Sequence, residues 1–211
     1  MPILPYCVVL ANLNYKLPLT GIRESVVERL EQGPLTVLYS EIEKPIPPTS
    51  FQQMALEFHR LVHSVFEHGA VMPFRFPTWL TQIELATHLQ EESQRYEAFL
   101  KEHSDHVQME LRITRPPDEP SPLETSSGTE HLRMRAAHFR RLNSAVENLK
   151  QLLSADVVEW RERDTPEGMR LYALVSRRSV VNFRERLSRR EHSIGLRWSG
   201  PWPTTEFLEK R

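Results

Sequence analysis

The stretch HVQMELRIT, residues 106–114, alternates apolar and polar side chains over its whole length. Val107, Met109, Leu111 and Ile113 fall on one side of an extended chain, and the residues between them are polar or charged. Strict alternation of this kind is typical of a β-strand with one face on a core and the other face toward solvent. We therefore predict a half-buried strand at 106–114.

The segments after this strand predict a helix, a hairpin, a second helix and a last strand. Apolar residues recur at helical spacing between 132 and 153, and VVEWRER and MRLYALVSR flank the turn DTPEG. A helix is expected to begin at Ser179, and SIGLRWSG (193–200) predicts a strand that ends at Pro201. The resulting order, β-α-β-β-α-β, is that of the ferredoxin-like arrangement.

The first hundred residues predict a smaller α+β unit with the order β-β-α-β-α. Apolar runs at 3–13 and 35–42 are typical of strands, and a helix is expected from Ser50, with Gln53 at capping-box spacing. AVMPFRFPT (70–78) predicts a strand that Pro73 and Pro77 restrict to a sheet edge or a bulge, and a long helix runs from Thr78 to about His103.

The predicted fold class is therefore α+β with two domains. The N-terminal domain spans 1–104, and the C-terminal ferredoxin-like domain spans 105–200, with a flexible Pro- and Ser-rich loop at 115–130. A tail follows at 201–211. At 211 residues and 39% hydrophobic composition, the chain can bury two small cores.

The net charge of −1 hides a division of the chain into an acidic and a basic part. Residues 1–130 contain 10 Lys+Arg and 18 Asp+Glu, a balance of −8, whereas residues 131–198 contain 15 and 8, a balance of +7. Lys150 is the only lysine among the cations of the basic part. This division indicates either solvated surfaces of opposite charge or halves that meet each other or a charged partner.

The residue types that carry catalysis or bind metal do not form a familiar motif. Gly-rich phosphate loops, G-x-S-x-G, Cys-x-x-Cys and H-E-x-x-H are all missing from the sequence. His59 and His63 lie four apart on a predicted helix, a spacing that more often marks a helix surface than a metal site, and Cys7 lies in a predicted core strand. We predict no catalytic residue, no metal site and no cofactor.

The amino-terminal sequence and the single cysteine favour a cytoplasmic protein. The run MPILPYCVVLANL has no basic region before its short apolar segment, so we interpret it as a strand rather than a signal peptide. The sequence has no stretch long enough to span a membrane, and one cysteine cannot form an internal disulfide.

Four stretches resemble the signatures of the gas vesicle accessory protein family of the F/L type. They are VMPFRFPTWL (71–80), LRWSGPWPTTEF (196–207), SSGTEHLRMR (126–135) and HVQMELRI, in an order and spacing that match over nearly the whole chain. The sequence departs from the family pattern at Pro77, at His131 and at Thr204–Glu206. It is thus identified as a divergent member.

The resemblance implies a non-enzymatic accessory protein of gas vesicle assembly with two α+β domains. Its partners would be the small apolar shell-forming protein and other gas vesicle accessory proteins, with no nucleic acid, membrane or small-molecule substrate. An amphipathic shell subunit aggregates unless its apolar face is covered, so a helper needs exposed aromatic or strand-edge surface, and strand addition is one route. The candidate contacts are Phe74, Arg75, Phe76, Trp79, Trp198, Trp202 and Phe207.

Two alternatives stay open at the level of sequence. Arg75 forms either a structural ion pair on the far face of its strand or a direct partner contact. The function could instead be that of a ferredoxin-like RNA-binding or regulatory protein-interaction module. Against RNA, the basic stretches MRAAHFRR and RLSRR lie on predicted helices, and the sheet lacks the K/R-G-F/Y-G/A-F motif.

Overall fold

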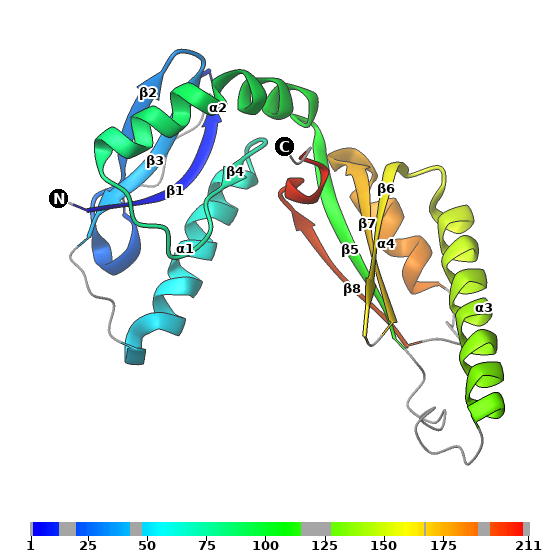
Figure 1. The fold of residues 1–211 in the computed structure, drawn as a ribbon. Coiled ribbons are helices and arrows are strands. Elements are labelled where there is room, and N and C mark those ends of the chain that lie inside the picture. Colours follow the sequence, from blue (N-terminus) through cyan, green and yellow to red (C-terminus); the bar gives the residue numbers. More distant parts are fainter. Residues whose placement is uncertain are drawn as a thin grey trace. The chain divides into compact units, whose positions relative to one another are not determined.

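The computed structural model describes residues 2–12, 20–42, 48–114, 128–166, 168–189 and 195–208 (Figure 1). Contacts along the chain divide it into an N-terminal unit that ends at Asp105 and a C-terminal unit that begins at His106. Of the loop predicted at 115–130, residues 115–127 lie outside the described residues, and 128–130 begin a helix instead.

The N-terminal unit is a four-stranded antiparallel sheet with two helices. Its elements are β1 (Ile3–Leu10), β2 (Glu28–Gln32), β3 (Leu35–Glu41), α1 (Phe51–Phe66), β4 (Met72–Pro73) and α2 (Gln82–Glu102). Short 3₁₀ turns occupy Ile22–Glu24 and Pro48–Ser50. The strands lie in the order β2-β3-β1-β4. The predicted order β-β-α-β-α was wrong in one respect, because it omitted β2.

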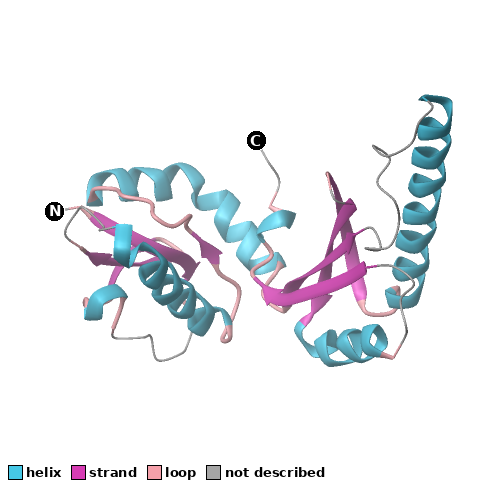
Figure 2. Cartoon of the chain, turned by 90° about the horizontal axis from the view of Figure 1, so that it is seen from below, coloured by secondary structure: helices cyan, strands magenta, loops and turns pink. Residues whose placement is uncertain are grey.

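Helices cover both faces of this sheet, which explains the composition of its central strands. In β1 and β3 nearly every residue is buried, so neither strand shows the alternation of a half-exposed strand. Helix α1 lies on one face and α2 on the other (Figure 2). Met54, Phe58 and Val65 of α1 are buried, and Leu85 and Leu89 of α2 are fully buried.

The helix starts of this unit differ from the prediction. Ser50 precedes α1 with a helical backbone conformation, and its side chain makes no capping hydrogen bond, so the predicted capping box is wrong. A capping box instead starts α2, where Thr81 Oγ1 accepts from the Glu84 N–H at 3.2 Å and Glu84 Oε2 accepts from the Thr81 N–H at 2.7 Å.

The strand predicted at 70–78 is much shorter in the structure. Only Met72–Pro73 pairs with β1, and this two-residue strand lies at the sheet edge, as the prolines predict. Pro73 has no N–H with which to extend the ladder, and the chain leaves the sheet soon after it. Phe74 and Phe76 therefore do not share a strand face.

The C-terminal unit is a second four-stranded antiparallel sheet with two helices. Its elements are β5 (His106–Thr114), α3 (Gly128–Leu153), β6 (Val157–Thr165), β7 (Gly168–Ser176), α4 (Val180–Ser188) and β8 (Gly195–Trp202). Turns of 3₁₀ helix occupy Arg177–Ser179 and Thr205–Phe207. The strand order is β6-β7-β5-β8, and the strand–helix sequence is the predicted one.

The apolar positions of β5 are buried as predicted, but its polar face is only partly open to solvent. Val107, Met109, Leu111 and Ile113 are at most 1% exposed, whereas Arg112 is exposed, Glu110 is partly exposed and Gln108 is 5% exposed. Leu142, Val146, Leu149 and Leu153 of α3 and Phe183 and Leu187 of α4 complete this core. Both helices lie on one side of the sheet, and the C-terminal turn lies on the other (Figure 2).

Pro201 lies within β8 and does not end it, contrary to the prediction. The strand reaches Trp202, which pairs with Gln108 after an irregularity in the register between Gln108 and Glu110. A proline is tolerated here because β8 is an edge strand and this part of the ladder is bulged. Gly200 has a φ of 121°, and a Cβ there would lie 2.9 Å from the Gln108 carbonyl oxygen.

Among the helices that the structure describes, none is long and apolar enough to cross a membrane.

Candidate partner-binding site

The segment Phe74–Trp79 is held at both ends against β1. At its first residue, the Phe74 N–H donates to the Tyr6 carbonyl at 2.9 Å. After it, Leu80 exchanges two backbone hydrogen bonds with Ile3, at 2.8 and 3.2 Å. The residues between these anchors connect two points of β1, and within them Thr78 Oγ1 donates to the Arg75 carbonyl.

Aromatic rings of this segment pack onto both helices of the N-terminal unit. Phe76 lies between Phe51 and Phe58 of α1, with ring centroids 5.4 and 5.2 Å apart. Phe58 is buried, but Phe51 is 45% exposed and Phe76 is partly exposed. On the α2 side, Phe74 contacts the ring of His88 at 5.9 Å. We call Phe51, Phe76 and the half-buried Trp79 the aromatic rim.

Arg75 is exposed, and its position does not fit the prediction of a structural ion pair on the far face of a strand. The residue lies outside β4, so it does not occupy a sheet face. In the part of the chain that the structure describes, no carboxylate forms an ion pair with it. The predicted structural ion pair is therefore wrong for the described residues, whereas the partner contact stays a prediction.

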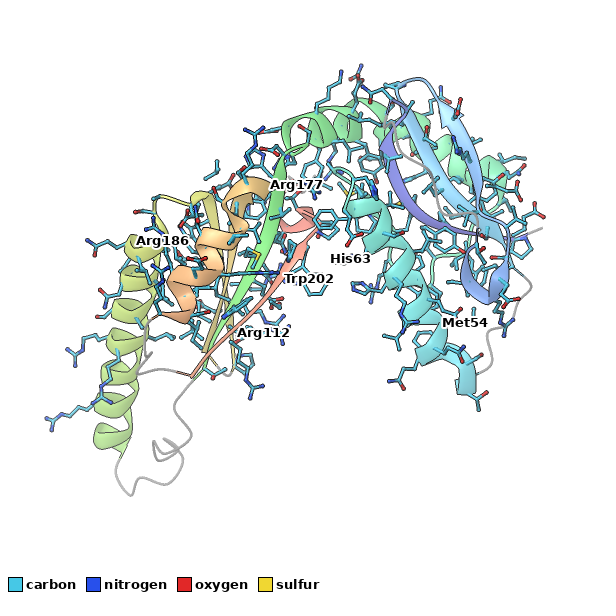
Figure 3. All side chains as sticks on the ribbon, turned by 180° about the vertical axis from the view of Figure 1, so that it is seen from behind. Met54, His63, Arg112, Arg177, Arg186 and Trp202 are labelled. Carbon is cyan, nitrogen blue, oxygen red and sulfur yellow. The ribbon has the colours of Figure 1, made fainter. Side chains whose placement is uncertain are left out.

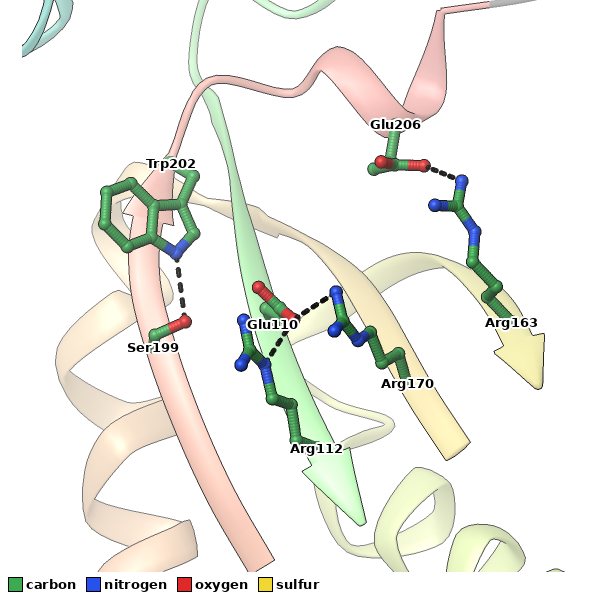
Figure 4. A network of polar contacts seen from close by, with 7 residues as sticks. All are labelled: Glu110, Arg112, Arg163, Arg170, Ser199, Trp202 and Glu206. Atoms are coloured by element: carbon green, nitrogen blue, oxygen red, sulfur yellow. Dashed lines mark hydrogen bonds and ion pairs between the residues drawn. The ribbon is translucent and has the colours of Figure 1, made fainter. Parts of the chain in front are cut away.

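The two C-terminal tryptophans have different surroundings. Trp198 pairs with Leu111 in the β5–β8 register, so it lies on the helix-covered face, where the Arg184 guanidinium stands 5.7 Å from its ring centroid. It is nevertheless 39% exposed. Trp202 is half-buried, and its Nε1 donates to Ser199 Oγ at 3.1 Å (Figure 4).

Phe207 is the one candidate contact whose ring is buried. Only 3% of the residue is exposed, and the Arg161 guanidinium lies 5.1 Å from the ring centroid. It anchors the turn Thr205–Phe207 on the sheet face that the helices leave uncovered. Because its ring is enclosed, Phe207 is not available as a surface contact. Its inclusion among the predicted partner contacts was therefore wrong.

A polar network on this sheet face was missed by the sequence analysis (Figure 4). Glu110 Oε1 accepts from Arg112 Nε at 2.7 Å and lies 3.6 Å from Arg170 Nη1. Glu206 Oε2 accepts from Arg163 at 2.8 Å. The only sign of this network in the sequence is that Glu110 and Arg112 take outward positions of HVQMELRIT. Its members on the other strands can be identified only when the pairing register of the strands is known.

The remaining titratable candidates do not form a reactive site. Burial raises the pKa of the Cys7 thiol to about 12, so the thiolate is suppressed. His63 lies on α1 (Figure 3), and its ring is 6.0 Å from that of His59. Burial, with the neighbouring His63, lowers the pKa of His59. Across the described ranges, no cluster of three His, Cys, Asp or Glu residues could hold a metal ion.

Solved structures show which known fold the chain shares. The crystal structure of the gas vesicle protein GvpF from Anabaena sp. PCC7120 matches with a TM-score of 0.79 at 13% sequence identity, covering 100% of this chain and 97% of that one. GvpF from Microcystis aeruginosa matches with a TM-score of 0.79 at 14% identity, covering 99% of each chain. At these identities the likeness shows the fold alone.

Sequence comparison gives the family directly. No curated protein sequence matches the chain. The family model for gas vesicle synthesis protein GvpL/GvpF matches residues 3–209, which is nearly the entire sequence. The chain therefore belongs to the gas vesicle synthesis protein GvpL/GvpF family.

Proposed function

We propose that this protein is a non-enzymatic accessory factor of gas vesicle assembly that binds the shell-forming subunit in the cytoplasm. The family membership supports a role in gas vesicle assembly, and the aromatic rim supports binding through exposed aromatic side chains. We also infer that the two compact units are separate domains and that the C-terminal one is ferredoxin-like, which its strand order β6-β7-β5-β8 supports.

The observation that carries the proposal is an exposed aromatic surface on a fixed framework. Phe76 is clamped between Phe51 and Phe58, and the segment that carries it is tied to β1 at both ends. Rings held in place lose little conformational entropy when a partner covers them. A shell subunit with an apolar face offers a surface that such rings can cover.

Side-chain contact fits this rim better than strand addition at β4. Strand addition needs a run of free N–H and C=O groups along an edge, and β4 pairs over Met72 and Pro73 only. We therefore assign the contact to the rings of the aromatic rim and to the adjacent Phe74 and Arg75, with Trp198 and Trp202 as a second contact.

Co-expression with the shell subunit tests this proposal. The chain, carrying an affinity tag, should keep the shell subunit in the supernatant and retain it through purification. The double variant Phe51→Ala/Phe76→Ala should lose most of the retained subunit. Ile83→Ala is the matched control, because Ile83 is 79% exposed and lies on α2 outside the rim.

Thermal unfolding of each variant shows whether it is folded before its binding is compared. Equal retention by the double variant and the wild type would refute the rim as the contact. Failure of the wild-type chain to retain the subunit at all would refute the function itself.

A further inference from the structure

Four arginines form a straight row across the C-terminal sheet, one from each strand. In the register of the ladders, Arg163 of β6 lies opposite Arg170 of β7, Arg170 opposite Arg112 of β5, and Arg112 opposite Arg197 of β8. Directly opposite residues point to the same side of a sheet. Since Arg112 alternates with the buried Leu111 and Ile113, the row lies on the face away from α3 and α4. We call these four residues the arginine row.

The basic excess was predicted to lie on helices, and the row shows that part of it lies on the sheet. Like charges directly opposite each other destabilise a pair of strands. Two carboxylates offset the repulsion in part, because Glu110 lies between Arg112 and Arg170 and Glu206 pairs with Arg163 (Figure 4). Four guanidinium groups and two carboxylates leave a charge of +2. Within the described ranges, no ion pair reaches Arg197.

The guanidinium groups are open to solvent, whereas their carboxylate partner is covered. The side chains of Arg112, Arg163 and Arg170 are 52%, 50% and 38% exposed, but that of Glu110 is 13% exposed. A partner that approaches this face therefore meets positive charge first. With strands about 4.8 Å apart, the row is about 14 Å long.

We propose that the arginine row, on the C-terminal unit, binds an acidic helix of a protein partner. Guanidinium groups can form paired hydrogen bonds with carboxylates. The carboxylate of Glu206, in the turn after β8, already accepts one hydrogen bond from Arg163. On one side of a helix, glutamates three or four residues apart repeat at about 5–6 Å. This spacing is close to the spacing of the arginines from strand to strand.

The same face is poorly suited to single-stranded RNA. Ferredoxin-like RNA-binding sheets stack bases on aromatic rings of the central strands. Here the outward aromatic residue of the central strands is Tyr172, which is 5% exposed and lies 5.7 Å from the Arg163 guanidinium. Trp202 is half-buried and lies on the edge strand β8, opposite Gln108, so the central strands offer charge without an open ring on which bases could stack.

Binding of a designed peptide to the full chain tests the proposal. The probe is a fluorescent helical peptide with glutamates at alternating three- and four-residue steps, and the control peptide has glutamine at the same places. Arg197→Gln should weaken binding of the glutamate peptide about tenfold, as expected for one hydrogen bond to a charged group. Arg189→Gln, directly after the end of α4 and 77% exposed, removes the same charge elsewhere and should leave binding within about twofold.

Three results would overturn the proposal. One is equal binding of the glutamate and glutamine peptides, and another is an equal loss in the two variants. The third is tighter binding of a single-stranded oligouridine than of the glutamate peptide at the same salt concentration, which would assign the row to nucleic acid. Arg197 makes no ion pair with a described residue, so its variant should fold, and an unchanged unfolding temperature checks this. The aromatic rim plays no part in the assay, so the proposed function stands or falls separately.

Discussion

Arg163 on β6 donates a hydrogen bond to Glu206 at 2.8 Å, joining residues 43 positions apart in the chain. Arg161 adds a second link by donating to the Glu206 carbonyl at 2.7 Å, and the Glu206 N–H donates to Gln108 Oε1 at 3.1 Å. The stretch after Trp202, predicted as a tail, is thus built into the C-terminal unit as far as Leu208.

Removal of the Phe207 ring should destabilise this unit strongly. Phe207→Ala empties a site that is 3% exposed, and losses of about 3 kcal/mol are typical of buried phenylalanines. Urea unfolding followed by circular dichroism measures the change. Glu206→Gln keeps the backbone links and should cost less than about 1 kcal/mol. Equal effects of the two substitutions would contradict the anchoring role of the ring.

Tyr6 should be required for the stability of the N-terminal unit. Its hydroxyl accepts from the Ile22 N–H at 3.1 Å and donates to Ser40 Oγ at 3.0 Å, and Ser40 in turn donates to the Val26 carbonyl. Tyr6→Phe leaves a buried N–H without its acceptor, which costs about 1–3 kcal/mol. Urea unfolding of Tyr6→Phe, Ser40→Ala and the double variant should give non-additive losses. Additive losses would show that the chain of hydrogen bonds does not act as a unit.

The two helix starts predict losses of stability of different size when a hydroxyl is removed. Thr81→Ala removes a capping side chain from α2 and should lower the free energy of unfolding by about 1 kcal/mol. Ser50→Ala removes a hydroxyl that makes no capping hydrogen bond and should cost clearly less. Thermal unfolding of both variants checks the ranking, and a larger loss for Ser50→Ala would contradict it.

The Cys7 thiol should be inert while the protein is folded. Burial raises its pKa from 9.0 to about 12, so at pH 8 a thiol-specific reagent should react only after urea unfolds the chain. Since the unfolded thiol releases its proton first, the stability contributed by the protonated thiol is present below pH 9 and falls as pH rises toward 12. Rapid labelling under native conditions would contradict the buried placement.

The elements with strong periodic patterns could be predicted from sequence, and the ones that depend on pairing could not. HVQMELRIT reveals β5 because its core and solvent positions alternate, but β2, with the sequence ERLEQ, has a single apolar residue and no such signal. The strand predicted at 70–78 was too long because Phe74 and Phe76 resemble a strand face, although each packs against a different helix.

The candidate site shows the same limit. The aromatic segments can be recognised in the sequence. The burial of Phe207 could not be predicted, because it depends on where the turn Thr205–Phe207 packs on the sheet. The arginine row depends on strand order and register. In both sheets the first strand lies between the third and the fourth, and nothing in Arg112 or Arg197 alone reveals that they are neighbours.

Site-specific photo-crosslinking tests most directly whether the aromatic rim contacts the shell subunit. A photoreactive phenylalanine is placed at Phe76, at Trp202, or at the control position Val181, which is 63% exposed on α4. In cells that make the shell subunit, we predict a crosslinked product of the two proteins from position 76, a weaker one from position 202 and none from position 181. Crosslinking to the shell subunit from position 181 alone, or no crosslink from position 76, would contradict it.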